Sequence, residues 1–449
     1  MKTVLDNAAA LSKGETNSQT LTEQALQRMN DPEGQGAKVF IRRNDARAMN
    51  LAKASDLVRT AGHPRSPLEG LPISVKDLFD LTGETTLAAS KAAESASPAA
   101  ADAPVVRRLI AAGAVITGTT NMSEYAFSGL GLNPHYGTPL NPYDRAIGRI
   151  PGGSSSGAAV SVADGMAIAA IGTDTGGSIR IPSALCGLTG FKPTAERIPR
   201  RGSLPLSTTL DSIGPLAQSV TCCAIVDAVL AGEDPEAIPS ALPISGLRLA
   251  VPQTVVLSDM DAAVASAFER ALSRLSKAGA VITDLPMEEF GELGTINARG
   301  SIIAAEAYHW HQDLIEHSGA SYDQRVRTRI LKGAEMSAID LLRLLDARLD
   351  WRERVAAKMH GFDAMIMPTV PVVAPALAPL EIDDELFFKT NALILRNPSI
   401  INFLDGCALS LPCHEPCSAP VGLTVAGLST SDRHVLAAGL AIEQVLTLQ

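Results

Sequence analysis

The sequence predicts an α/β protein with a mainly parallel or mixed β-sheet. From Leu71 onward, short apolar runs alternate with segments of helical spacing, and this alternation is typical of such sheets. Hydrophobic residues make up 46% of the 449 residues and charged residues 19%, proportions typical of a folded globular chain. The length exceeds that of a minimal single core, although large α/β enzymes often form one continuous globule.

The first half of the chain changes texture once. Apolar residues at helical spacing over 20–30 and 44–62 predict an N-terminal helical segment, which we place at 1–65. The core that follows, about 66–220, contains in order a strand at 71–75, a helix at 104–113, a strand at 114–118, a helix at 155–163 and a strand at 167–172.

The second half begins after a Pro-rich linker at 234–247. The stretch 295–360 is strongly helical and carries most of the long charged side chains, so we expect a cap or insertion over one face. Around it we expect a strand at 246–252, a helix at 260–278, strands at 280–286 and within 362–380, and a closing strand and helix within 419–449. We predict that residues 1–449 form one domain.

Composition also restricts partners and compartment. A formal net charge of −10 argues against a nucleic-acid surface, which needs clustered Lys and Arg. The most apolar stretch, 157–172, is interrupted by Asp164 and is shorter than the ~20 residues that span a bilayer, so we expect no membrane association. Six cysteines are too few for a disulfide framework, and the N-terminus lacks the apolar core of a signal peptide. We therefore expect a cytoplasmic protein.

A Gly/Ser-rich segment at 151–194 contains two Gly-Gly-Ser sites, which end at Ser154 and Ser178. Glycines before a serine permit a sharp turn and close approach to a ligand, and free N–H groups in such turns can bind an oxyanion. Plain turns and helix caps are the alternatives. A phosphate loop lacks its Gly-Lys-Ser/Thr, a dinucleotide site lacks G-x-G-x-x-G, and no G-x-S-x-G elbow is present.

A lysine upstream could serve this segment as a base. Lys76 follows the apolar run LPISV, so its backbone lies where side chains are buried. Burial lowers a lysine pKa and leaves a neutral amine that can activate a serine. An ordinary strand-end lysine paired with Asp77 or Asp80 is the alternative.

Taken together, GLPISVKD, GGSSSG, GTDTGGSIRIPSALCG and GFKPT, in this order and spacing, resemble the amidase signature family. The resemblance covers about 70–216 and is weaker in MPTVP and APVGLTVAG. It implies one large α/β/α fold around a mixed sheet. It also implies a catalytic Lys76, a relay Ser154 after a cis Gly–Ser bond, a nucleophile Ser178, and an oxyanion hole from the N–H groups of Thr175, Gly176, Gly177 and Ser178.

The resemblance also assigns supporting roles. Ser155 is expected to donate to Lys76 or Ser154, and Asp174 to hold the loop by accepting backbone N–H bonds. Ser156 replaces the glycine usual in GGSSGG, a variation that some family members share. The residues that we expect near a substrate pocket are Met122, Tyr125, His135 and Arg180, with packing as the alternative for each and a structural role favoured for Arg180.

Other clusters carry less. His309 and His311, with Glu306, suggest a metal, but ring nitrogens two residues apart on a helix point apart. Cys413 and Cys417 lack a second pair at ligand spacing. We expect neither metal nor cofactor.

The sequence therefore predicts an amidohydrolase that cleaves a small linear amide, a carboxamide or a urea/biuret-type compound, and releases ammonia or an amine. The alternative is the glutamine-hydrolysing catalytic component of a tRNA-dependent amidotransferase, although Ile181 stands where that component has glutamine. A membrane-bound fatty-amide hydrolase and a catalytically silent binding protein are disfavoured. By its resemblance to the family we expect a homodimer.

Overall fold

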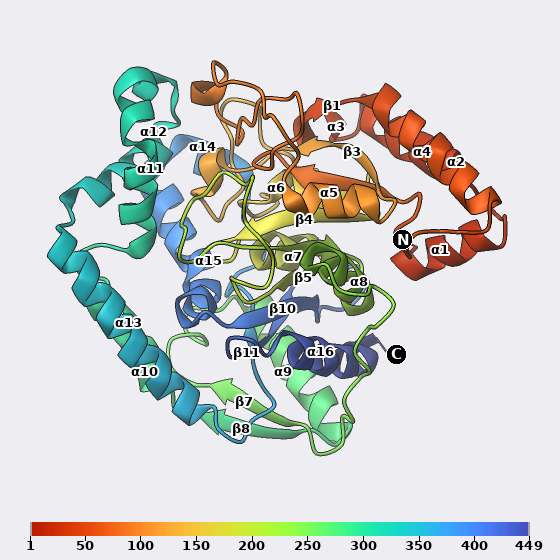
Figure 1. The fold of residues 1–449 in the computed structure, drawn as a ribbon. Helices are drawn as coiled ribbons and strands as arrows, with labels where there is room; N and C mark the ends of the chain where they lie inside the picture. Colours follow the sequence, from red (N-terminus) through yellow and green to blue (C-terminus); the bar gives the residue numbers. More distant parts are fainter. Residues whose placement is uncertain (1, 448–449) are drawn as a thin grey trace.

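The computed structural model describes residues 2–447, and within them an eleven-stranded sheet forms the centre of the molecule (Figure 1). The strand order is β1-β3-β2-β4-β6-β5-β10-β11-β9-β7-β8. Parallel and antiparallel pairs alternate in blocks, so the sheet is mixed. The strands are β1 (Phe40–Arg43), β2 (Pro72–Lys76), β3 (Val115–Thr120), β4 (Ala169–Asp174), β5 (Thr189–Lys192), β6 (Ser212–Ala217), β7 (Arg248–Pro252), β8 (Val281–Leu285), β9 (Ala364–Pro368), β10 (Cys407–Pro412) and β11 (Gly422–Gly427).

Helices cover both faces of this sheet. Leu409 of β10 packs against Gly439 on one face, whereas the next residue, Ser410, points with Gly422 toward Ala184 on the other. The helices are α1 (Val4–Ser12), α2 (Ser18–Asn30), α3 (Gly36–Val39), α4 (Asp45–Thr60), α5 (Pro104–Ala111), α6 (Ser156–Ala163), α7 (Arg180–Cys186), α8 (Val220–Ala231), α9 (Ala262–Lys277), α10 (Glu288–Ile296), α11 (Ile302–Ser318), α12 (Gln324–Leu331), α13 (Ala338–Lys358), α14 (Leu377–Ile382), α15 (Asp384–Leu404) and α16 (Asp432–Thr447). Helices α8 and α16 pack on one face, and α6 and α7 on the other. The mixed sheet flanked by helices confirms the predicted fold class.

The central strands are buried on both faces, which explains their composition. Every residue of β2, β3, β4 and β6 is buried, because helices cover the sheet on both sides. Strands in that position read as continuous apolar or small-residue runs without polar alternation. A lysine at the end of such a strand, as in β2, is therefore carried into the interior by its neighbours.

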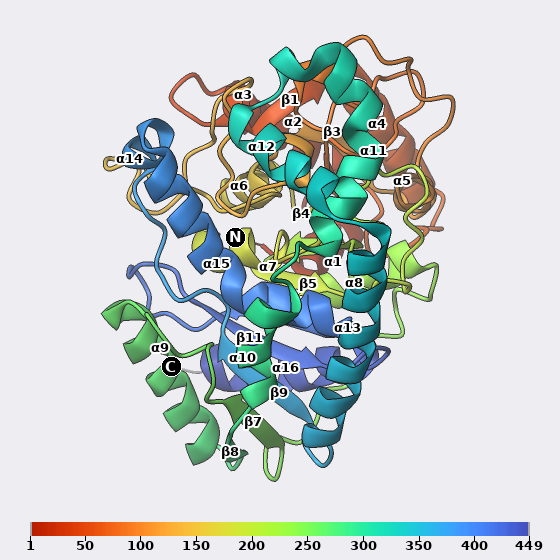
Figure 2. The same cartoon turned by 90° about the vertical axis from the view of Figure 1, so that its left-hand side faces the viewer.

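The helical segment predicted at 295–360 contains α11, α12 and α13, and we call residues 295–360 the cap. Figure 1 shows α10 to α13 along one side of the molecule, opposite α1, α2 and α4. In Figure 2 the long α13 runs down the molecule beside α15. No helix among residues 2–447 has both the length and the apolar composition needed to cross a membrane.

The sequence pattern does not predict α15. Its 21 residues include Pro398 in the helix interior and three buried asparagines, Asn391, Asn397 and Asn402. Proline normally interrupts a helix because it lacks an N–H, and buried asparagines break the apolar periodicity on which a helix prediction depends. Tertiary contacts to the sheet stabilise this helix despite its sequence, and α15 borders the site described next.

Trp351 of α13 provides a test of how the cap is attached. Its ring is fully buried against Phe290 and Phe403, at centroid distances of 6.1 and 5.3 Å, and its Nε1 donates to the Glu289 carbonyl at 2.6 Å. We expect Trp351→Ala to destabilise the protein by about 3–5 kcal/mol, because it leaves a cavity. Urea unfolding measures this change. Trp310→Ala, at a ring that is 41% exposed, is the control, with an expected loss below about 1.5 kcal/mol.

Candidate active site

Lys76 is the last residue of β2 and is fully buried. Its Nζ donates to Ser154 Oγ at 2.7 Å and to Thr173 Oγ1 at 2.9 Å. Burial lowers its pKa to about 7, and the negative charges of Asp211 and Asp174 oppose that shift. A substantial fraction of this amine is therefore neutral near pH 7, as a general base requires.

Ser154 lies in a tight turn between Gly152 and α6. The Gly153–Ser154 peptide bond is cis, in agreement with the bond that the resemblance implies. A side chain at Gly153 would approach the N of Gly131 to 2.5 Å, so glycine is required there for packing. Two bonds hold the turn: Gly153 N–H donates to the Gly129 carbonyl at 2.8 Å, and Ser123 N–H donates to the Ser154 carbonyl at 3.1 Å.

Ser178 lies in the turn that joins β4 to α7, and we call residues 175–178 the oxyanion turn. Gly177 in this turn has φ +127°, and a Cβ there would lie 2.6 Å from Pro398 of α15. The Ser178 carbonyl accepts the N–H of Ser155 at 3.3 Å. This bond connects the second Gly-Gly-Ser site to the first, so the two serines that the sequence separates by 24 positions belong to one site.

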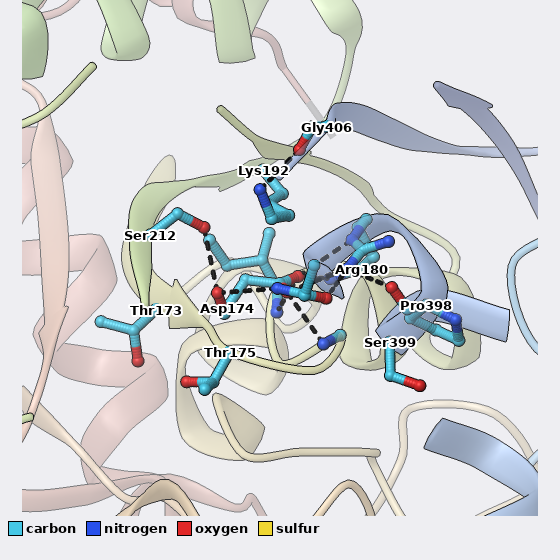
Figure 3. A network of polar contacts seen from close by, with 12 residues as sticks. Thr173, Asp174, Thr175, Arg180, Lys192, Ser212, Pro398, Ser399 and Gly406 are labelled. Carbon is cyan, nitrogen blue, oxygen red and sulfur yellow. Dashed lines mark hydrogen bonds and ion pairs between the residues drawn. The ribbon is translucent and has the colours of Figure 1, made fainter. Parts of the chain in front are cut away.

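Asp174 holds the oxyanion turn from inside (Figure 3). Its carboxylate accepts the N–H of Gly177 at 2.8 Å and of Ile179 at 3.1 Å, which matches the structural role expected for it. It also pairs with Arg180 at 2.9 Å and accepts from Asn402 Nδ2 at 2.9 Å. Although burial alone would raise it, the pKa of Asp174 is lowered well below its usual range, chiefly because the Arg180 charge and hydrogen bonds stabilise the anion.

Arg180 is fully buried in this network. Its Nη2 also donates to the Pro398 carbonyl at 3.0 Å and to Asn402 Oδ1 at 2.6 Å, and both residues belong to α15. These contacts agree with the structural interpretation of Arg180 and make it an anchor between the oxyanion turn and α15.

Lys192 is a second buried lysine beside the same network. Its Nζ donates to the carbonyls of Pro193 at 2.8 Å and Gly406 at 2.7 Å, as Figure 3 shows for Gly406. Burial lowers its pKa to about 8, and the Asp174 charge opposes the shift. The sequence places this lysine in GFKPT but indicates no role for it.

The Ser155 hydroxyl does not have the expected partners. It donates to the Thr173 carbonyl at 3.4 Å instead of to Lys76 or Ser154. The second acceptor of Lys76 is the Thr173 hydroxyl, which the sequence motifs did not indicate. Strand pairing is the signal that could have found it, because β2 and β4 pair Val75 with Ile171 and so bring the ends of both strands together.

The oxyanion turn leaves some of its N–H groups available. Gly177 N–H is already donated to Asp174, so it is engaged in this structure. For the N–H groups of Thr175, Gly176 and Ser178, no hydrogen bond to another residue within 2–447 is found. A cavity of about 200 Å³ adjoins the turn. Its lining includes Thr175, Leu210, Ser301, Ile302, Ser399 and Asn402.

The predicted pocket residues Met122, Tyr125 and His135 lie in the loops that lead to Ser154. Met122 is fully buried, and the Tyr125 ring packs edge-on against His311 of the cap at 4.4 Å. His135 Nε2 lies 2.9 Å from the buried carboxylate of Glu124. Tyr125 and His135 are thus engaged in packing and in a hydrogen bond, and contact of any of the three with substrate stays a prediction.

The candidate metal ligands do not converge. Glu306 accepts hydrogen bonds from residues 207–209, and His311 Nδ1 lies 2.9 Å from the Tyr322 hydroxyl. Among residues 2–447, no group of three His, Cys, Asp or Glu side chains is placed to hold a metal ion.

The Lys76 environment makes a pH-dependent prediction. If neutral Lys76 activates Ser178, the rate of Ser178 labelling by a fluorophosphonate should rise with pH through a midpoint near 7, because only the free amine accepts a proton. Stopped assays of labelling between pH 5 and 10 measure the midpoint, with Lys76→Met as the unreactive control. A midpoint near 10, the value of an ordinary lysine, would contradict the assignment.

Comparison with known proteins agrees with this site. The chain matches the Amidase family model over residues 20–436. It is 35% identical to the 2-amino-5-chloromuconic acid deaminase of Comamonas testosteroni, over 89% of this chain and 87% of the relative. It is also 35% identical to a component of the 1-carboxybiuret hydrolase of Pseudomonas sp. (strain ADP), over 84% of this chain and 83% of that component.

Further relatives match nearly the whole length. The catalytic component of the glutamyl-tRNA(Gln) amidotransferase of Moorella thermoacetica is 32% identical over 97% of this chain and 94% of its own. The crystal structure of an amidase superposes with a TM-score of 0.88 at 32% identity and covers 99% of both chains. The chain therefore belongs to the amidase signature family and is a hydrolase that acts on C–N bonds.

Proposed function

We propose that the chain hydrolyses a small linear amide through an acyl-enzyme on Ser178. The observation that carries this proposal is the buried Lys76 amine, 2.7 Å from Ser154 Oγ, with a pKa of about 7. A lysine in this state can accept a proton that a serine releases, whereas an exposed lysine would be protonated.

The proposed proton path runs through Ser154. The Ser178 hydroxyl attacks the amide carbonyl carbon and passes its proton to Ser154, whose own proton moves to Lys76 Nζ. The free N–H groups of the oxyanion turn stabilise the oxyanion. The path then reverses and protonates the leaving nitrogen, so ammonia or an amine departs. Water attacks the remaining ester and releases the acid, which restores Ser178.

Arg329 of α12 supports a substrate that carries a carboxylate. Its guanidinium lies 4.2 Å from the centroid of the Phe127 ring and donates to the Phe127 carbonyl. Desolvation lowers its pKa to about 10, and no carboxylate within residues 2–447 forms an ion pair with it. Phe127 belongs to the loop whose Ser123 N–H and Gly129 carbonyl hold the Ser154 turn. An unpaired, desolvated cation beside the site suits an anionic ligand.

The relatives support the same substrate class. The names of two of them specify an acid, 2-amino-5-chloromuconic acid, and a carboxylated biuret. We therefore propose an amide or a urea/biuret-type compound with a carboxylate as the substrate. The second candidate, glutamine hydrolysis for a tRNA-dependent amidotransferase, rests on the 32% identity to the amidotransferase component of Moorella thermoacetica.

A substrate panel tests the proposal. Ammonia release from malonamate, a carboxylated biuret, an uncharged aliphatic amide and L-glutamine is measured without any partner protein. Faster release from the first two than from the uncharged amide supports a free-standing hydrolase of carboxylated amides. Release from L-glutamine alone, and only with added amidotransferase partners, would establish the second candidate instead. Ser178→Ala is the inactive control.

Arg329 makes the second half of the test specific. We expect Arg329→Met to raise KM for the carboxylated substrate about 10- to 100-fold and to leave the uncharged amide nearly unchanged, because a charge-assisted hydrogen bond is lost. Steady-state kinetics measure both. Arg343→Met, an exposed arginine on α13, is the matched control. Equal losses for both substrates would show that Arg329 serves only the structure.

A further inference from the structure

We propose that Asp211 and Glu306 are positioning residues that tie the cap to the oxyanion turn through residues 206–211, here called the connecting turn. The inference rests on the proposed function only in that Ser178 is the reactive residue. It assigns to two carboxylates, which the mechanism itself does not use, the task of holding Thr175 and the cap in one fixed relation.

Asp211 makes the connection to the oxyanion turn. Its buried carboxylate accepts the hydroxyl of Thr175 and, through its other oxygen, the N–H groups of Leu206 at 3.0 Å and Ser207 at 3.1 Å. One side chain thus fixes the start of the connecting turn against the first residue of the oxyanion turn. Thr175 is also one of the residues whose N–H is free to stabilise an oxyanion.

Glu306 makes the connection to the cap. This residue of α11 accepts the hydroxyls of Ser207, Thr208 and Thr209, and also the Thr209 N–H at 3.1 Å. Four donors from three consecutive residues converge on one carboxylate, so the connecting turn and α11 are held as a unit. Charge-assisted hydrogen bonds of this kind are stronger than neutral ones.

The two connections share Ser207, and they meet at the cavity beside the oxyanion turn. Ser207 donates its hydroxyl to Glu306 and its N–H to Asp211. Leu210 of the connecting turn lines the cavity together with Thr175 and with Ser301 and Ile302 at the start of α11. A shift of the cap would therefore move both a wall of the cavity and the support of Thr175.

A purely structural role for Glu306 makes a different prediction. If Glu306 only attached the cap, its loss would lower stability without a specific effect on Ser178. If it positions the oxyanion turn, its effect on Ser178 must depend on the Thr175 hydroxyl, although Glu306 and Thr175 share no hydrogen bond. Energetic coupling between residues that do not touch requires a connection between them, and a double-mutant cycle measures it.

The experiment measures the second-order rate of Ser178 labelling by an alkyl fluorophosphonate, in which Ser178 Oγ bonds to phosphorus and fluoride leaves. The cycle compares wild type, Glu306→Gln, Thr175→Val and the double variant at pH 8. Glu306→Gln replaces one acceptor oxygen with an NH₂ group that cannot accept the Thr209 N–H. Glu316→Gln, an exposed residue of the same helix, is the matched control, and Thr175→Ser should restore the rate lost in Thr175→Val.

We expect Glu306→Gln to slow labelling about fivefold in the wild-type background and less than about twofold in Thr175→Val. The pH midpoint should stay unchanged in Glu306→Gln, because the charges that shift the Lys76 pKa are those of Asp211 and Asp174. Thr209→Val, which removes a single donor to Glu306, should give a smaller effect of the same kind if Glu306→Gln folds poorly.

Two results would overturn the proposal. Equal fold-losses from Glu306→Gln in both Thr175 backgrounds would show that the cap and the oxyanion turn act independently. A rate like that of Glu316→Gln would show that Glu306 has no effect on the site. Failure of the proposed function looks different: wild type itself would not be labelled, or Ser178→Ala would be labelled equally, and the inference would fall with it.

Discussion

The buried carboxylate of Asp174 is the interaction on which the arrangement of the site depends. It lies at the end of β4 and binds the backbone of the oxyanion turn, the guanidinium of Arg180 and the amide of Asn402. Removal of one partner from a buried ion pair typically costs about 3–5 kcal/mol, because the other charge is left without compensation. The same carboxylate therefore fixes the turn that carries Ser178 and joins it to α15, an element more than 200 positions away in sequence.

Two buried lysines lie near this carboxylate, and their hydrogen-bond partners give them different roles. Lys192 donates to two carbonyls, which can only accept, so its environment favours a nitrogen with every proton in place. Lys76 donates to two hydroxyls, which can also donate, so it can lose a proton and then accept one from Ser154. Burial depresses the pKa of both amines, but only Lys76 has a partner that can return a proton.

The cap and the catalytic turns are physically continuous. Glu124, beside the Ser154 turn, accepts the N–H of Asp323 at the start of α12 at 2.7 Å, and Glu306 binds the connecting turn from α11. Arg329 also comes from α12 and faces the same loop as Glu124. The helices that are expected to select the substrate are thus held by the elements that are expected to perform the chemistry, and a shape change in one is transmitted to the other.

The sequence by itself determined the fold class, the family and the identity of Lys76, Ser154 and Ser178, because these depend on local patterns and motifs that are contiguous in the chain. Tertiary structure alone decided the partners. Thr173 meets Lys76 through pairing of β2 with β4, Glu306 meets 207–209 across almost a hundred positions, and α15 forms despite Pro398 because Arg180 and the sheet stabilise it. The Gly177 N–H, expected in the oxyanion hole, is engaged by Asp174. Contacts between distant segments leave no periodic signal in a single sequence, and burial, which sets the Lys76 pKa, exists only once those segments have packed.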